Sequence, residues 1–218
     1  MKHSLKIVLW LISLAFLLNA CSLRHHSGYK KTEAFETKEY DFIAHHFQKV
    51  LFNTRIQVLG NEASGLLFIK LMDKDDYRFV FLTQLGMKIF DVELCDNQFK
   101  IHQLISYLDK KNIRRILEND LKLLIRTPDK KYNSEYFVHK SNKQYLLRES
   151  YARNNNYYQY ANQKINLKEN SGILFLRTQI HYFYKGGTLP EKIKIKHSGI
   201  NIEWQLQPIK KKLKQEHK

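Results

Sequence analysis

Apolar and polar residues alternate most regularly near the end of the chain. Ile193 and Ile195 alternate with lysines, and residues 200–207 alternate in the same way after a His-Ser-Gly break. A period of two is typical of a strand with one buried and one solvated face, and a short polar break between two such strands predicts a hairpin. The sequence therefore predicts a terminal β-hairpin whose apolar face includes Ile202 and Trp204.

Similar β-rich runs, separated by polar turns, recur over most of the chain. Besides the hairpin, the predicted strands are residues 55–59, 65–72, 77–83, 87–94, 99–105, 135–139, 144–151, 157–162 and 173–184. About ten antiparallel strands with one-sided patterns predict a mainly β (α+β) fold, an incomplete and strongly curved antiparallel β-barrel.

Two segments show helical periodicity instead. Between residues 108 and 126, leucines and isoleucines fall on one stripe while lysines and arginines lie elsewhere, which predicts an amphipathic helix. The apolar residues of segment 33–52 also recur at helical spacing, so a second helix is predicted there. We expect both helices to cover the concave side of the sheet.

The first residues of the chain are typical of an exported lipoprotein. Lys2 and Lys6 flank the start of an apolar core at residues 7–18, which is too short to span a bilayer as a helix and suits a signal peptide. The following Leu18-Asn19-Ala20-Cys21 resembles a lipobox, in which the cysteine is lipidated and the preceding segment is removed. An ordinary signal peptide with a cysteine near its cleavage site has the same pattern. We expect Cys21 to carry the lipid anchor.

The composition divides the chain into four parts. Residues 1–20 are the expected signal peptide, 21–32 a lipidated tether, 33–209 one folded domain and 210–218 a basic tail. The domain is long enough to bury a substantial core. With Cys21 lipidated, the second cysteine has no partner, so no disulfide is expected. We expect a monomer attached to a bilayer by its N-terminus.

The chain is strongly basic, with a formal net charge of +16. Much of the excess lies in the tail and in the lysines of segment 192–196. A basic periplasmic surface attracts anionic lipid headgroups, although a lysine-biased composition that only solvates the surface gives the same count. Nucleic acid is not an expected partner in that compartment.

No combination of residues predicts catalysis, a metal site or a cofactor. Asp91 and Glu93 stand two apart on one predicted strand, as a pair of catalytic carboxylates does, but so do carboxylates on any solvated strand face. The histidines of the adjacent pairs 25–26 and 45–46 point to different faces of a helix or strand and are poor joint ligands. We expect a protein that is not an enzyme.

Residues 77–94 combine a predicted strand, a short turn in which Leu85 precedes Gly86, and a second strand. This arrangement resembles LolB, the family of outer-membrane lipoprotein receptors, in which such a strand ends in Thr-Asn-Pro-Leu-Gly. Thr83, Leu85 and Gly86 match that motif, whereas Gln84 stands where the family has proline. The order of lipobox, tether, helix, strands, central helix and terminal hairpin resembles the family over most of the domain.

The resemblance implies a LolA/LolB-like half-barrel with a helical lid over an apolar cavity. It implies a protein that receives lipoproteins from a LolA-like periplasmic carrier, holds their acyl chains and inserts them into the inner leaflet of the outer membrane. It also implies that Gln84, Leu85 and Gly86 form the membrane-insertion loop. The alternative is that Leu85 folds back onto the domain. Ser22 stands where some inner-membrane lipoproteins have a retaining aspartate, which favours a periplasm-facing location in the outer membrane.

The apolar faces of the predicted strands supply candidates for the lining of such a cavity. These are Phe79, Phe81, Phe90, Val92, Ile193, Ile195, Ile202 and Trp204. The same residues would equally form a filled core. This leaves open a protein of the same fold that binds another lipid or a glycolipid, an envelope-assembly lipoprotein with a filled interior, and an enzyme for which no residue is a candidate.

Overall fold

A computed structural model describes residues 28–35, 48–73, 76–96, 98–125, 132–141, 144–151, 154–171, 177–187 and 189–209. In this part of the chain, 13 strands form one antiparallel sheet. The strands are β1 (Tyr29–Thr32), β2 (Lys49–Val58), β3 (Asn61–Asp73), β4 (Asp76–Thr83), β5 (Lys88–Cys95), β6 (Gln98–Leu104), β7 (Asn133–His139), β8 (Gln144–Tyr151), β9 (Asn154–Ala161), β10 (Lys164–Ser171), β11 (Arg177–Phe183), β12 (Lys192–His197) and β13 (Ile202–Pro208).

The strand order is β1-β7-β8-β9-β10-β11-β12-β13-β2-β3-β4-β5-β6, so the sheet is open, with β1 and β6 at its edges. Most neighbours are also consecutive in sequence, as expected for hairpin connections. Two pairings are long-range. β13 pairs with β2, which joins the terminal hairpin to the first long strands, and β1 pairs with β7. The prediction of a mainly β, antiparallel fold is confirmed.

One face of this sheet is apolar over most of its width. Directly opposed residues point to the same face, and the pairs Ile195–Trp204, Trp204–Ile56 and Phe81–Phe90 place the predicted lining residues together. All eight are at most 4% exposed. The alternation in the sequence therefore identified the buried face correctly, and we call this face, which includes all eight, the inner face.

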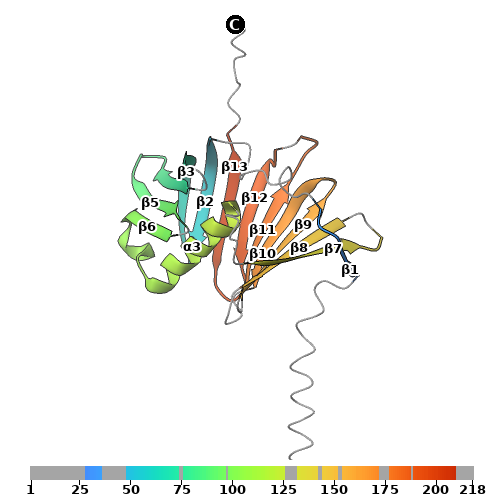
Figure 1. Cartoon of the computed structure of the whole chain (residues 1–218). Helices are drawn as coiled ribbons and strands as arrows, with labels where there is room; N and C mark the ends of the chain where they lie inside the picture. Colours follow the sequence, from blue (N-terminus) through green and yellow to red (C-terminus); the bar gives the residue numbers. More distant parts are fainter. Residues whose placement is uncertain are drawn as a thin grey trace, which may run out of the picture.

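Helix α3 (Lys111–Ile125) follows a short 3₁₀ helix, η3 (Ser106–Leu108), and lies across the inner face (Figure 1). Its buried residues up to Leu121 recur three or four apart and form one stripe that packs on the strands, and the last three residues of the helix are buried as well. They are Ile113, Ile116, Leu117, Asp120, Leu121, Leu123, Leu124 and Ile125. The helix predicted at 108–126 is confirmed over Lys111–Ile125. No helix in the described residues is long and apolar enough to cross a membrane.

Three expectations differ from the structure at the level of elements. The helix expected over 33–52 is wrong at its end, because Lys49–Val58 is strand β2. Val50 and Phe52 continue the buried alternation of this strand, and only their chance spacing to earlier apolar residues suggested a helix. Residues 36–47 of that predicted helix lie outside the described residues.

The expected tether and the expected strand count also differ. Residues 29–32 form edge strand β1, which pairs with β7, so the end of the segment called a tether belongs to the sheet. Strand β10 was not predicted, because Lys168 and other polar residues break its apolar pattern. With β1 and β10, the described sheet has 13 strands where about ten were expected.

Candidate functional site

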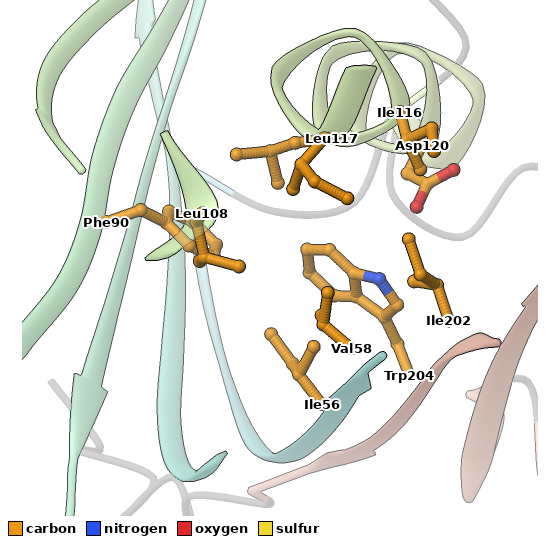
Figure 2. Close-up of a pocket in the computed structure, with 10 residues that line it drawn as sticks. Ile56, Val58, Phe90, Leu108, Ile116, Leu117, Asp120, Ile202 and Trp204 are labelled. Atoms are coloured by element: carbon orange, nitrogen blue, oxygen red, sulfur yellow. The ribbon is translucent and has the colours of Figure 1, made fainter. Parts of the chain in front are cut away.

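An apolar pocket lies between α3 and the inner face of the sheet (Figure 2). Its walls come from the helix, from η3 and from strands β2, β5 and β13. The lining residues are Ile56, Val58, Phe90, Leu108, Ile113, Ile116, Leu117, Asp120, Ile202 and Trp204. The cavity has a volume of about 20 Å³, which is room for roughly one water molecule. The empty space around it is about 310 Å³, including open solvent.

The structure brings three of the eight predicted lining residues to this pocket, namely Phe90, Ile202 and Trp204. The other five belong to the core around it. They are Phe79, Phe81, Val92, Ile193 and Ile195. They lie on the same inner face but are not among the residues that line this pocket. All five are buried, and the ring centre of Phe81 lies 5.7 Å from that of Phe90.

Two residues in the otherwise apolar lining of the pocket each carry a buried polar atom without a partner. The Asp120 side chain is fully buried and Trp204 is 3% exposed. Asp120 Oδ2 and Trp204 Nε1 have no hydrogen-bond partner in the described part of the chain. Figure 2 shows the indole nitrogen on the side of Trp204 that faces the helix, with the Asp120 carboxylate above it.

The other oxygen of Asp120 joins α3 to the sheet. His197 Nε2 lies 2.8 Å from Asp120 Oδ1, and His197 Nδ1 lies 2.9 Å from the carbonyl oxygen of Ile202. Thr178 donates a longer hydrogen bond of 3.4 Å to the same Asp120 oxygen. Because a carbonyl oxygen only accepts, Nδ1 must carry a proton. The second proton lies between Nε2 and the carboxyl group, so the histidine and the carboxyl group together are neutral.

This environment shifts the protonation of both groups. Burial raises the pKa of the Asp120 carboxyl, and the charge and hydrogen bond of His197 only partly offset this. Burial alone would lower the pKa of His197, but the charge and hydrogen bond of Asp120 and the carbonyl of Ile202 raise it overall. Both shifts have the same consequence, since each makes the folded pair hold its shared proton more tightly than the unfolded chain does.

A buried lysine holds the C-terminal end of the helix, one turn beyond Asp120. Lys168 of β10 is fully buried and donates a 2.8 Å hydrogen bond to the carbonyl oxygen of Leu124 in the last turn of α3. A cation is favourable at this end of a helix because the last carbonyl groups lack partners within the helix. The ring of Tyr182 lies 5.7 Å from the same ammonium group. The helix is therefore fixed to the sheet by polar contacts at two points.

The loop between β4 and β5 projects Leu85 into solvent. The side chain is 97% exposed and the nearby Met87 is 58% exposed. Thr83 closes the loop, since its N–H donates to the Met87 carbonyl at 2.8 Å and its carbonyl accepts from the Gly86 N–H at 2.9 Å. Gly86 has a φ of +80°, which favours glycine. The alternative that Leu85 folds back onto the domain is wrong.

The sheet topology places a second exposed leucine at the same end. β2 and β3 join at residues 59–60, and β3 runs the length of the sheet before β4 returns to the loop with Leu85. Leu59 is 51% exposed in that first turn. Met72, which is 50% exposed, lies at the opposite end of β3. One end of the sheet therefore carries exposed Leu59, Leu85 and Met87.

The carboxylates of β5 have structural partners. Asp91 is 3% exposed and accepts two hydrogen bonds from Arg78 and one from Lys88, at 2.8–3.1 Å. Burial alone would raise the pKa of Asp91, but these cations lower it overall. Glu93 lies 2.8 Å from His102. Ion pairs hold Asp91, and a histidine contact holds Glu93. Within the described ranges, no three histidine, cysteine, aspartate or glutamate side chains gather as a metal site would require.

The lysines of β12 lie opposite its buried isoleucines, on the outer face. Lys194 and Lys196 lie 3.6 and 3.8 Å from the two oxygens of Glu203 on β13. This pairing neutralises part of the charge that suggested attraction to anionic lipid. The basic tail 210–218 lies outside the described residues.

Sequence reasoning did not find the polar cluster of Asp120, His197 and Thr178, or the separate buried lysine, Lys168. One signal was present, because Asp120 falls on the apolar stripe of α3 beside Leu117 and Leu121. A carboxylate on a buried helix stripe needs a partner. Its partner, His197, is 77 residues further along the chain, and only the fold brings the two together.

No family model matches this chain, and neither does any curated protein. Cys21 and the segment that resembles a signal peptide lie outside the described residues, since the first of these is residue 28.

Proposed function

We propose that the protein is a lipid-anchored receptor of the outer membrane that accepts lipoproteins from a soluble periplasmic carrier and delivers them into the inner leaflet. Exposed Leu85 is the observation that carries this proposal. A leucine that is 97% exposed at the tip of a hydrogen-bonded loop gains nothing from the fold. It gains free energy when it enters a bilayer.

The position of this loop supports a membrane role. Leu59 and Met87 are exposed at the same end of the sheet, so several apolar side chains would meet a bilayer together. Gln84, Leu85 and Gly86 would form the insertion loop. Cys21 would hold the domain close to the membrane, which raises the effective concentration of a weakly inserting tip.

The inner face supports a role in holding acyl chains. Each methylene group moved from water to an apolar site contributes about 0.8 kcal/mol, so one long chain gains on the order of 10 kcal/mol. The apolar residues beneath α3 offer such a site if the helix moves outward. Transfer would then need no nucleotide, because the lipoprotein passes to the site that holds its chains more tightly.

The small volume of the pocket favours a second candidate function. An enclosed space of about 20 Å³ is what a filled interior has. The second candidate is a non-enzymatic envelope-assembly lipoprotein of the same fold, whose exposed loop contacts a membrane or a partner but which carries no lipid.

Depletion of the protein in its host, followed by replacement with variants, tests the proposal. Depletion should cause other lipoproteins to accumulate in the inner membrane or the periplasm. Leu85→Glu should still take up lipoprotein from the carrier and lose delivery, because a charged side chain within a bilayer costs roughly 3 kcal/mol. Met72→Glu is the matched control at the opposite end of the sheet and should restore delivery.

Two results would contradict the proposal. Normal lipoprotein localisation in depleted cells would remove the receptor function altogether and leave the assembly lipoprotein. Normal delivery by Leu85→Glu would remove the role of the loop.

A further inference from the structure

We infer that the open edge of β6 binds the extended segment that follows the lipidated cysteine of an incoming lipoprotein, as an added antiparallel strand. This inference rests on the proposed function, since it names the part of the lipoprotein that the receptor would hold outside its apolar interior. Strand addition takes its affinity from main-chain hydrogen bonds and its selectivity from alternate side chains.

The edge of β6 carries the inference. β6 pairs with β5 on one side, and within the described ranges no strand pairs with its other side. Alternate residues of an edge strand direct their N–H and C=O groups away from the sheet, where they can pair with an added chain. Gln98, Lys100 and Ile101 are exposed, so this edge is accessible.

A bulge limits the usable length of the edge. Two adjacent residues of β5 pair with Gln103 and Ile101, so His102 between them is an extra residue that interrupts the ladder. The regular stretch is Gln98–Ile101, in which each of four residues pairs with β5. Bulges also discourage pairing along a whole edge. The site therefore fits a short strand.

The chain itself offers a precedent for the occupant. The proposed function makes residues 21–32 a lipoprotein tether, and the last residues of this segment form β1. β1 has four residues and pairs antiparallel with β7 at the opposite edge of the sheet. A tether strand of the same length, from another lipoprotein, would match Gln98–Ile101.

Antiparallel addition would direct the lipid of the incoming protein toward the loop with Leu85. The neighbouring pairs β4–β5 and β5–β6 are antiparallel. Because β6 runs from Gln98 to Leu104, an antiparallel strand would begin beside Ile101 and end beside Gln98. Its lipidated start would then lie on the side of Leu104, which pairs with Phe90 near the beginning of β5. The loop that carries Leu85 leads into that end of β5.

The side chains along the edge define the sequence that fits. Phe99 and Ile101 pair with buried residues of β5, so they lie on the inner face, and Ile101 is 37% exposed. Lys100 lies on the outer face and makes no ion pair within the described part of the chain. Apolar pairs and opposite charges across strands both stabilise pairing. An added strand should therefore alternate apolar residues with an acidic residue opposite Lys100.

A peptide titration of the ¹⁵N-labelled full chain tests the pairing. The probe is a short acetylated peptide in which valine and glutamate alternate, and two further forms carry N-methyl groups on either the valines or the glutamates. The parent peptide should slow exchange of alternate amides in Gln98–Ile101. Consecutive residues of a strand direct their amides to opposite edges, so one methylated form should bind at least about tenfold more weakly and the other should bind like the parent.

A charge variant tests the selectivity of the edge. Lys100→Gln should weaken binding of the parent peptide about two- to fivefold, because the peptide carboxylate loses its opposite charge. Lys70→Gln is the matched control, since Lys70 is exposed on β3, which has strands on both sides, and it should leave binding unchanged.

Photo-cross-linking identifies the occupant. A benzophenone amino acid replaces Lys100, or Lys70 as the control, and an acylated lipoprotein is supplied by its carrier. Cross-links from position 100 should map to the segment just after the lipidated cysteine of that lipoprotein, and position 70 should give none.

Several outcomes would overturn the inference. Equal binding of the two methylated peptides, or no binding of the parent peptide at millimolar concentration, excludes strand addition. Protection of β6 amides in a concentration-dependent dimer makes a second copy the occupant. Cross-links confined to the folded part of the lipoprotein exclude its tether. The depletion experiment decides the receptor function separately from all of these, since it measures delivery and not binding at β6.

Discussion

Gly65 of β3 is a residue at which the sheet has no space for a side chain. A Cβ atom there would lie 1.9 Å from the carbonyl oxygen of Leu82 on β4. Backbone must therefore move, and the two strands separate next to the loop that carries Leu85. We predict that Gly65→Ala lowers the free energy of unfolding by at least about 2 kcal/mol.

Gly60→Ala is the control for this prediction. Gly60 has open space around it and a φ of +89°, so alanine there causes only backbone strain of about 1 kcal/mol. Urea unfolding of both variants measures the difference. Equal destabilisation would mean that β3 and β4 adjust to the added methyl group without loss.

The Asp120–His197 pair predicts a pH-dependent stability. The folded pKa of His197 is raised, so its contribution is fully present below the unfolded pKa of about 6.5 and is lost as the pH rises through the folded value. The raised pKa of Asp120 acts in the same direction, because the folded carboxyl group also holds its proton more tightly. We predict that the free energy of unfolding falls as the pH rises above about 6.5.

The contribution of the pair can be isolated with histidine variants. His197→Gln should remove most of this slope and lower stability by about 3–5 kcal/mol at pH 6.5, because a buried carboxyl group loses its partner. His181 has a lowered pKa, from burial and then from Lys196, so its effect lies below pH 6.5 and His181→Gln should leave the slope intact. An unchanged slope in His197→Gln would contradict the assignment.

At the scale of elements, the buried lysine of β10 fixes the end of α3. Lys168→Met keeps most of the side-chain volume but removes the hydrogen bond to Leu124 O. We predict a loss of about 1–3 kcal/mol in unfolding free energy, and faster amide hydrogen exchange in residues 121–125 than in the rest of the helix. Lys70→Met, on exposed β3 surface, should change neither. Stabilisation by Lys168→Met would show that burying the ammonium group costs more than its contacts return.

The elements that sequence reasoning predicted share one property, an apolar pattern of their own. α3 and the β12–β13 hairpin carry regular stripes, and their positions were predicted to within a few residues. β10 has Lys168 and Glu169 at buried positions, so its pattern is irregular although its backbone pairs on both sides. β1 has four residues, and only its pairing with β7 defines it as a strand. Strands that depend on partners elsewhere leave little local signal.

At the scale of the whole molecule, alternation predicts which residues face inward but not how well they fill the interior. The eight lining candidates were placed on the correct face because a period of two fixes the face. Five of them lie in the core instead. Which side chains pack together depends on how strands such as β2, β3 and β4 pair, and that pairing cannot be derived from the alternation alone. The pocket beside Asp120 likewise requires α3 to lie across β13 and β2.

The volume beneath α3 gives a last prediction about the molecule as a lipid carrier. A methylene group is close in size to a water molecule, whose share of liquid volume is about 30 Å³, so an acyl chain of about 16 carbons needs roughly 450 Å³. The empty space at the pocket is about 310 Å³ even with open solvent included. A protein that holds even one such chain must therefore move α3 away from β2 and β13.

Hydrogen exchange detects this motion. In the presence of an acylated lipoprotein supplied by its carrier, amides of residues 111–125 should exchange faster, whereas the central strands β2 and β3 should keep their protection. Side-chain contacts attach α3 to the sheet, whereas a continuous ladder of backbone hydrogen bonds joins β2 to β3. Comparing exchange in these two groups of amides therefore distinguishes displacement of the helix from loosening of the whole domain. Unchanged exchange in α3 with lipoprotein bound would place the acyl chains elsewhere on the molecule, and the inner face would then be only a core.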